Sequence, residues 1–296
     1  MISIKECPIC SGTTFSPFVT CTDHSVSHET FTILKCSTCQ LLITSPRPED
    51  SELGKYYLSA AYTSHINQAA SLMDKAYVVA RSFTLKWKLS LILKHNSNKA
   101  GKLLDFGCGV GEFLKASAMK GWQVSGVEPS SIARTNANPV VSKHIVPSVK
   151  DLTDQQKKFD VITAWHVLEH VADLNNTLEV LTGLLQPNGT IFIAVPNHNS
   201  WDAGHYQEYW AAYDVPRHLW HFTPPSMTKL LTAHSLRVIT VLPMRLDAYY
   251  VSLLSEKYKN SSSLPRLVNA ALNGVRSNYS AKSTGQYSSL VYIAKR

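Results

Sequence analysis

Several features typical of other protein classes are missing from this sequence. Charged residues make up only 17% of its 296 residues and no long low-complexity tract occurs, which argues against extensive disorder. No run of about 18 apolar residues is present, so no membrane-spanning helix is predicted. The opening MISIKECPIC has no apolar leader segment, so no secretory signal is visible and a cytoplasmic location is expected.

The sequence has enough apolar material for a substantial core. Hydrophobic residues make up 44% of the chain, and its length suits one large domain with a small accessory module. The formal net charge is +8, which would suit a polyanionic partner such as RNA. The basic residues are scattered, however, and pairs such as Lys86 and Lys88 are interpreted as ordinary solvated positions. A nucleic-acid partner is therefore possible but less favoured than a small-molecule acceptor.

The cysteines form a regular pattern. Four of the six make two Cys-x-x-Cys pairs, Cys7 with Cys10 and Cys36 with Cys39, separated by a short β-like run, TFTILKC. Two such pairs can supply four thiolates to one tetrahedral ion, the arrangement of a zinc ribbon. Disulfides or redox chemistry are the alternatives, but a reducing compartment disfavours disulfides and a redox site needs only one such pair.

A different ligand set is conceivable. Cys21 and His24 lie close together in CTDH and could complete a site with Cys7 and Cys10. The four-cysteine set is preferred because its two pairs match in spacing and turn character, which leaves Cys21 as a small buried residue. Four thiolates leave no open position for substrate, so the zinc is predicted to be structural.

The middle of the chain contains a glycine-rich turn within a βαβ pattern. Residues 102–106 form a short apolar run, residues 112–119 have helical composition, and residues 122–127 alternate as a second strand. Glycines let the backbone turn sharply and approach a ligand closely, and the helix start beyond them offers unpaired N–H groups. This unit has the size and form of a nucleotide-binding unit.

Two acidic residues make the pattern more specific. The turn reads D-x-G-x-G-x-G from Asp105, whereas a dinucleotide site would read G-x-G-x-x-G, which favours S-adenosylmethionine over NAD. Glu128 ends the second strand, where a carboxylate can accept hydrogen bonds from both ribose hydroxyls.

On these residues the chain resembles the class I S-adenosylmethionine-dependent methyltransferases, and more closely those with an N-terminal zinc ribbon. The resemblance implies an α/β fold with a seven-stranded, Rossmann-like sheet and a reversed C-terminal hairpin. The adenine contact near residues 150–152 is implied by position in the family alone. The cofactor-binding residues assigned on this basis are Asp105, Gly107, Cys108, Gly109, Gly111, Glu128, Pro129, Asp151, Leu152, Trp165 and His166.

The remaining segments fit that architecture. Further strands are expected at residues 159–164 and 190–195 and in the apolar runs SLRVITVLPM and SSLVYIAKR. The predicted domains are a zinc ribbon at 1–45, a helical linker or lid at 46–98 and the methyltransferase domain at 99–296. Within the last, a cap insertion is expected near 198–232 and a polar insertion, helical at 264–272, near 257–288.

Histidines follow the strand predicted at 159–164. His166, Glu169 and His170 have helical i, i+3, i+4 spacing and are predicted to share one face. Three roles are open: shaping the cofactor loop, acting as a general base, or binding a metal. Some quinone-type methyltransferases have a comparable Glu-x-x-Glu-His that can hold a divalent ion, but here the first position is histidine.

The segment 197–227 combines aromatics, histidines, aspartates and an arginine. Its DxPRHLxHF element, residues 214–222, resembles a signature of the zinc-ribbon methyltransferases. His218 and His221 are candidates for a catalytic or substrate role, with His166, because histidine can remove a hydroxyl proton near neutral pH. The alternative is a small cap core in which Asp214 and Arg217 form a bracing ion pair.

These patterns predict an S-adenosylmethionine-dependent methyltransferase acting on a small molecule. O-methylation of a sugar, a polysaccharide precursor or a secondary metabolite is favoured, by resemblance. One alternative is an RNA methyltransferase, because a ribosomal RNA family joins an N-terminal zinc site to this fold. Another is a non-catalytic subunit that binds S-adenosylmethionine without turnover.

Overall fold

The computed structural model describes residues 1–57, 72–259 and 262–296. Of the segment predicted to be a helical linker, residues 58–71 lie outside the described part. Before them a single 3-10 turn covers Leu53–Tyr57, and after them comes α2 (Leu72–His95). No helix in the described ranges combines the length and apolar character needed to cross a membrane.

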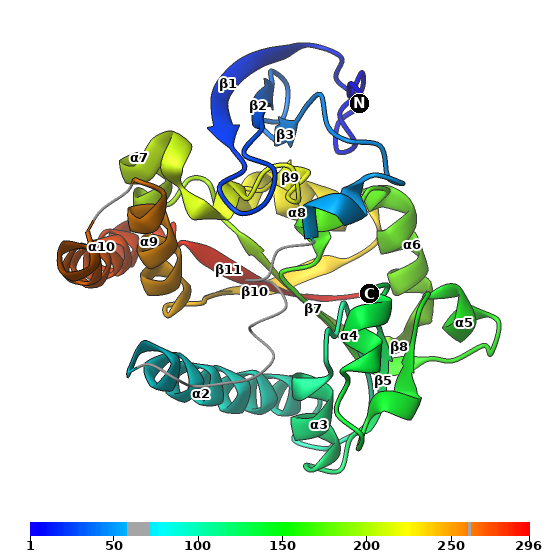
Figure 1. Ribbon diagram of the computed structural model, residues 1–296. Helices are drawn as coiled ribbons and strands as arrows, with labels where there is room; N and C mark the ends of the chain where they lie inside the picture. The colour runs from blue at the N-terminus through cyan, green and yellow to red at the C-terminus, as the bar shows by residue number, and fades with distance from the viewer. Residues whose placement is uncertain (58–71, 260–261) are drawn as a thin grey trace.

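A seven-stranded sheet occupies the centre of the molecule (Figure 1). Its order is β10-β11-β8-β7-β4-β5-β6; neighbouring strands from β8 to β6 run parallel, and β11 is antiparallel to both its neighbours. This confirms the predicted sheet with its reversed C-terminal hairpin. The strands are β4 (Lys102–Phe106), β5 (Gln123–Val127), β6 (Ile145–Val146), β7 (Phe159–Trp165), β8 (Leu185–Pro196), β10 (Arg237–Pro243) and β11 (Ser289–Lys295).

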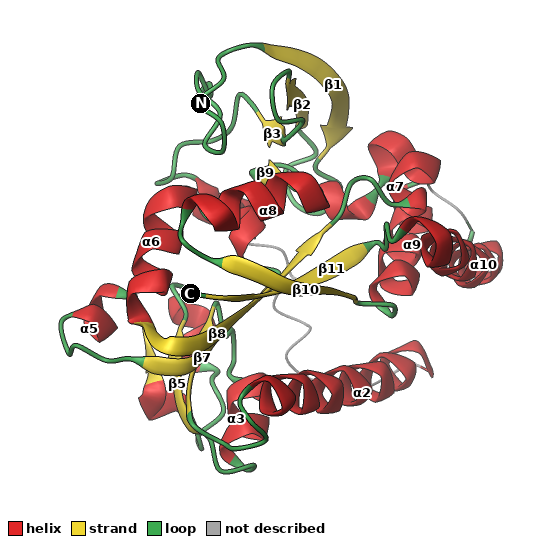
Figure 2. Cartoon of the chain, turned by 180° about the vertical axis from the view of Figure 1, so that it is seen from behind, coloured by secondary structure: helices red, strands yellow, loops and turns green. Residues whose placement is uncertain are grey.

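Helices cover both faces of this sheet, as Figures 1 and 2 show from opposite sides. Apolar residues of α2 and α3 pack on one face, and those of α6 and α8 pack on the other, so the central strands are buried on both sides. The helices after α2 are α3 (Glu112–Ala118), α4 (Ser131–Thr135), α5 (Lys150–Thr153), α6 (Leu174–Leu184), α7 (Trp201–Tyr206), α8 (Pro224–Ala233), α9 (Asp247–Tyr258) and α10 (Ser263–Thr284).

The N-terminal residues form a second, smaller sheet. Strands β1 (Phe15–Thr22), β2 (Thr30–Cys36) and β3 (Leu42–Thr44) are antiparallel, and the fourth strand, β9 (Trp220–His221), comes from the far part of the chain. One apolar cluster contains Ile9 and Ile43 of this segment together with residues of α6, α8 and the central strands. The N-terminal segment therefore shares the apolar core of the main domain instead of forming an independent module.

The polar segment between the last two strands is more helical than its composition predicts. A helix was expected at 264–272, but α10 runs from Ser263 to Thr284 and packs along α9. Asparagine, serine and glycine favour helices weakly in isolation. Here the small buried residues Ala270, Gly274 and Ala281 let the two helices approach closely, so tertiary packing overrides the local preference.

Candidate active site

The glycine-rich turn joins β4 to α3 and adopts the conformation that glycine permits. Gly107 and Gly109 have φ angles of 74° and 54°, in the left-handed region. A Cβ added at Gly107 would lie 2.4 Å from Cγ2 of Val167, whereas one at Gly109 would meet nothing within 4 Å. The Val167 side chain fills the space beside Gly107. The space beside Gly109 is open, so a ligand can lie against the backbone there.

Glu128 ties this turn to the end of β5. Its Oε2 accepts a hydrogen bond from the Gly109 amide at 2.9 Å, and its Oε1 accepts one from the Ser130 amide at 2.8 Å. Each carboxylate oxygen has a second lone-pair site, so Glu128 can still accept bonds from a ligand. Glu128 thus follows β5, as the sequence predicts, and its ribose contact stays a prediction.

Asp105 is buried at the end of β4, below the glycine turn. It accepts a 2.6 Å hydrogen bond from the Thr163 hydroxyl of β7. Burial raises the pKa of Asp105 to about 7, against the opposing effects of the Thr163 hydroxyl and the Lys88 ammonium. This carboxyl group is therefore sensitive to any charge brought into the neighbouring space.

Lys88, interpreted from the sequence as a solvated position, is half-buried in the structure. Its Nζ lies 4.3 Å from the ring centroid of Trp165, at the end of β7. Burial lowers the Lys88 pKa to about 8, although Asp105 and Asp247 attract the ammonium. The apolar pattern of α2 gave no signal for this, because a lysine beside an apolar stripe normally points to water.

The predicted adenine loop lies in the short helix α5. The side chain of Leu152 is fully buried in the main apolar cluster, and Asp151 accepts a hydrogen bond from the Ser148 amide at 3.1 Å. Cys108, also predicted to contact cofactor, is buried, with its sulfur close to Gly126 of β5. These contacts shape the loops around the turn, and the predicted roles of the three residues toward a ligand stay predictions.

The histidines after β7 do not share one helical face. His166 has a φ of 56° and lies before a 3-10 turn, Leu168–His170, so the helical spacing assumed from sequence does not apply. The His166 Nε2 is 2.9 Å from Asp247 Oδ2, and its Nδ1 is 3.4 Å from Glu169 Oε1. Asp247 starts α9, a partner that sequence spacing could not reveal.

His166 is predicted to carry its proton at neutral pH. Burial lowers its pKa, but the hydrogen bond to Asp247 and the close carboxylate of Glu169 outweigh burial and raise it to about 9. Its contribution to stability is therefore complete below the unfolded pKa of about 6.5 and is lost as pH rises through the folded value. NMR titration of the histidine ring should show this pKa, and Asp247→Asn should lower it; a ring that titrates normally in both proteins contradicts the pairing.

Glu169 is the buried centre of a histidine cluster. Its side chain is fully buried, and neither carboxylate oxygen has a hydrogen-bond partner of good geometry among the described residues. Burial raises its pKa, but the His166 contact and the attraction of His218 and His170 hold it below the usual value. Single ligand atoms of Glu169, His170 and His218 all lie within 4.8 Å of one another, close enough for one metal ion.

His218 and His221 occupy different surroundings. Nδ1 of His218 is 2.8 Å from the Ala212 carbonyl, so that nitrogen carries the proton and donates it, which leaves Nε2 with a lone pair. The His221 ring nitrogen Nε2 is 3.0 Å from the Thr44 hydroxyl at the N-terminal sheet, and burial holds its pKa well below the usual value. This placement favours a structural role for His221 at the junction of the two sheets.

Arg217 braces the same region from a buried position. It donates two hydrogen bonds to Asp214, from Nη2 at 2.6 Å and Nε at 3.0 Å, and its Nη2 also lies 3.0 Å from Asp23 Oδ1. The ion pair considered from sequence is therefore present, and it extends to Asp23 near the end of β1. The DxPRHLxHF element connects the N-terminal sheet to the main domain.

Arg217→Ala is expected to destabilise the protein by about 3 kcal/mol, because it removes the charged partner of the buried Asp23 carboxylate and of the partly exposed Asp214 carboxylate. Burial raises the pKa values of Asp23 and Asp214, but hydrogen bonds, including those from Arg217, outweigh it and hold both below the usual value. Their stabilisation is present above the unfolded pKa of about 3.9 and is lost as pH falls through the lower folded values. Thermal melts of both proteins from neutral to acid pH test this; parallel curves would exclude the linkage.

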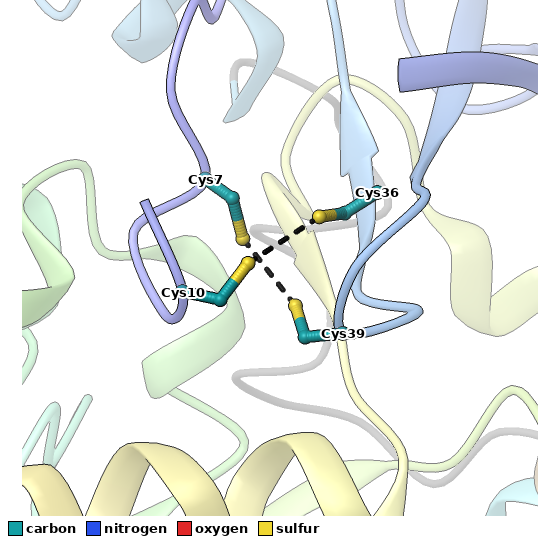
Figure 3. A group of neighbouring side chains, drawn as sticks. All are labelled: Cys7, Cys10, Cys36 and Cys39. Atoms are coloured by element: carbon teal, nitrogen blue, oxygen red, sulfur yellow. Dashed lines mark hydrogen bonds between the residues drawn. The ribbon is translucent and has the colours of Figure 1, made fainter. Parts of the chain in front are cut away.

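The four cysteines of the two pairs meet at one point, as Figure 3 shows. The sulfurs of Cys7 and Cys39 are 3.5 Å apart, as are those of Cys10 and Cys36, and all four lie within 4.8 Å of one another. Cys21 instead lies buried in a separate apolar cluster with Phe31 and Trp210. The structure therefore brings together the preferred ligand set and not the alternative one.

The two Cys-x-x-Cys turns are built in the same way. The Ser11 amide bonds to the Cys7 carbonyl and the Gln40 amide to the Cys36 carbonyl, at 2.9 and 3.0 Å. Ser11 and Gln40, which follow the second cysteine of each pair, both have positive φ angles. Each turn directs its two cysteine thiols toward the same point, so the four thiols can bind one metal ion.

Comparison with known proteins decides the family. The sequence model of a family described as a methyltransferase domain matches residues 81–241, which is more than half of the chain. The chain belongs to this methyltransferase family. The match covers the glycine turn, the histidine cluster and the DxPRHLxHF element, and it confirms that the chain is a methyltransferase.

Curated relatives of this methyltransferase carry one recurrent name. The ubiquinone biosynthesis O-methyltransferase of Vibrio atlanticus is 31% identical over 120 residues, covering 38% of this chain and 51% of the relative. That of Idiomarina loihiensis is 29% identical over 185 residues, covering 57% of this chain and 76% of the relative. The chain thus spans about half of the length of the first of these relatives.

A solved structure supports the fold. Magnesium protoporphyrin IX methyltransferase from Synechocystis PCC 6803, determined with bound SAH, superimposes with a TM-score of 0.55. The superposition covers 84% of this chain and 100% of that chain at 15% sequence identity. At this identity the likeness concerns the arrangement of helices and strands.

Proposed function

We propose that this protein binds S-adenosylmethionine and transfers its methyl group to a hydroxyl of a small molecule. The observation that carries the proposal is the turn after β4, with an open backbone at Gly109 beside the carboxylate of Glu128. Family membership independently supports methyl transfer. When bound, the cofactor supplies an electrophilic methyl group on a sulfonium.

The residues present fit this cofactor. Gly109 leaves its backbone open to a ligand, and Glu128 has lone pairs available for ribose hydroxyls. Asp105 at the end of β4 and Lys88 beside the end of β7 offer a carboxyl group and an amino group, which can hydrogen-bond the amino and carboxylate groups of the cofactor's methionine part. Trp165 offers an aromatic face beside them, next to Lys88. These side chains would position the cofactor for attack by the acceptor.

A hydroxyl acceptor is supported by the relatives' names, which refer to O-methylation in ubiquinone biosynthesis. The sequence-based preference for a sugar, a polysaccharide precursor or a secondary metabolite is kept here as the narrower proposal for the acceptor. His218 is the preferred general base, since its Nδ1 donates to a carbonyl and its Nε2 is left to accept a proton. His166, whose pKa is raised by Asp247 and Glu169, is better suited to positioning.

His218→Ala is therefore expected to lower kcat by about a hundredfold while the cofactor Kd stays unchanged. His221→Ala serves as the matched comparison, because its ring faces Thr44 at the sheet junction. We expect that variant to lose thermal stability and to keep most of its kcat. Cofactor titration, turnover and melting of both variants check this; equal turnover in His218→Ala and the parent protein would remove His218 as the base.

We also propose that the four cysteines hold one structural zinc ion. Tetrahedral zinc with Zn–S bonds of about 2.3 Å requires sulfur–sulfur separations of about 3.8 Å. The observed separations of 3.5 Å and the 4.8 Å limit for the whole cluster suit such a site. Four thiolates fill the coordination shell, so this ion would stabilise the fold and would not contact the acceptor.

The function is tested with S-adenosylmethionine labelled on its methyl group and a lysate separated into small-molecule and RNA fractions. Label in the small-molecule fraction, absent with Glu128→Ala protein, is the expected result and yields a compound to identify. Label in RNA would replace the proposal with the RNA methyltransferase alternative. Cofactor binding without label in either fraction would favour the non-catalytic alternative.

A further inference from the structure

Helix α10 carries its apolar side chains on the outside. Such a helix in a globular protein normally turns its apolar stripe toward the core and its polar face toward water. On α10 the exposed fractions of six large apolar side chains range from 41% to 73%. They are Leu264, Leu267, Val268, Leu272, Val275 and Tyr279.

These residues form one continuous outer stripe, here called the α10 stripe. Their spacings are three or four residues, apart from the adjacent pair Leu267 and Val268, so they follow one side of the helix. The inner side is made of small or polar residues such as Ala270, Gly274 and Ser277. A Cβ added at Gly274 would lie 2.4 Å from the Tyr249 ring of α9, which shows how closely the inner side packs.

The charges near the stripe have one dominant sign. Both acidic residues between 245 and 284 are engaged elsewhere: Asp247 pairs with His166, and Glu256 accepts a hydrogen bond from Tyr206. Helix α10 itself contains no acidic residue. The basic residues of this range are Arg245, Lys257, Lys259, Arg266, Arg276 and Lys282.

We propose that the α10 stripe docks on the surface of a lipid bilayer that contains anionic lipids. An amphipathic helix with an apolar face and basic flanks lies in the interfacial plane of such a membrane, and each basic residue near the surface adds attraction. A second copy of this chain fits less well, because two α10 helices would bring together basic residues with no acidic partner on either helix.

The hairpin of α9 and α10 places this surface near the site. Asp247, the first residue of α9, contacts His166, and α9 spans 12 residues, or about 18 Å of helix. Helix α10 then packs back along α9. Docking through the α10 stripe would therefore hold the carboxyl ends of the strands within about a helix length of the bilayer.

The test is flotation of the purified full chain with vesicles of phosphatidylcholine, with and without phosphatidylglycerol. We expect binding to the anionic vesicles, weaker binding to the neutral ones, and a loss of binding as salt is raised. Val268→Asp combined with Val275→Asp should lower the affinity for anionic vesicles by about tenfold or more, because it places two negative charges against negatively charged lipid headgroups.

The matched control is Met119→Asp combined with Val140→Asp, which makes the same charge change at two exposed apolar positions outside α10. This control should float like the parent protein, and circular dichroism should show all three proteins folded. No binding to anionic vesicles, or equal loss in the control, overturns the proposal. Light scattering that shows a dimer dissociated by the α10 double variant would identify a second copy as the occupant and also overturn it.

Discussion

Replacing Glu128 by alanine should weaken the binding of S-adenosylmethionine by roughly a hundredfold or more. A carboxylate that accepts two hydrogen bonds from ribose hydroxyls contributes about 1.5–3 kcal/mol per bond, and the variant loses both. It also loses the two bonds by which Glu128 holds the Gly109 and Ser130 amides. Isothermal titration with the cofactor measures the effect directly, without knowledge of the acceptor.

Two comparison proteins separate ligand contact from loop support. Glu128→Gln keeps one oxygen acceptor and most of the side-chain volume, so we expect an intermediate loss of affinity. Glu179→Gln removes an exposed carboxylate on α6 and should bind the cofactor like the parent protein. If Glu128→Ala binds with unchanged affinity while remaining folded, the cofactor site is assigned to the wrong turn.

If the four cysteines hold the proposed zinc ion, replacing Cys39 by serine should abolish zinc binding and greatly lower the melting temperature. Zinc sites of four ligands in small domains contribute on the order of 10 kcal/mol to folding, which is comparable to the whole stability of a typical domain. The effect should spread beyond the N-terminal sheet, because Cys7, Ile9 and Leu41 belong to the apolar cluster that contains α6 and α8. Metal analysis and thermal melting give the two readouts.

Cys21→Ala is the matched control for the cysteine prediction. Cys21 is buried in a different apolar cluster, so its loss should cost about 1 kcal/mol and leave equimolar zinc in the protein. A strong chelator should lower the melting temperature of the parent and of Cys21→Ala but change that of Cys39→Ser little. Retention of zinc by Cys39→Ser, or its loss from Cys21→Ala, would contradict the four-cysteine site.

The central sheet was predictable because its information is local. The strand expected at residues 102–106 is found at Lys102–Phe106, and that expected at 159–164 extends by one residue to Trp165. Continuous apolar runs bounded by polar or glycine residues specify strands buried on both faces. The glycine turn was equally predictable, because left-handed φ angles at alternate positions favour glycine directly.

The histidine cluster was less predictable, because loop backbone and distant partners decide it. A helical spacing suggested one face for His166 and His170, yet the positive φ of His166 turns them toward different partners. Lys88 was misplaced for a similar reason: whether a lysine next to an apolar stripe reaches water or a Trp165 ring depends on what covers the helix.

The sequence by itself determined most strands of the central sheet, the glycine turn with its two acidic residues, and the two matched cysteine pairs. These features arise from backbone preferences and side-chain spacing within a few residues. Only the tertiary structure decided that β9 completes the N-terminal sheet, that Arg217 reaches Asp23, and that α10 turns its apolar side outward. Each of these depends on contacts between segments far apart in the chain, which local spacing does not encode.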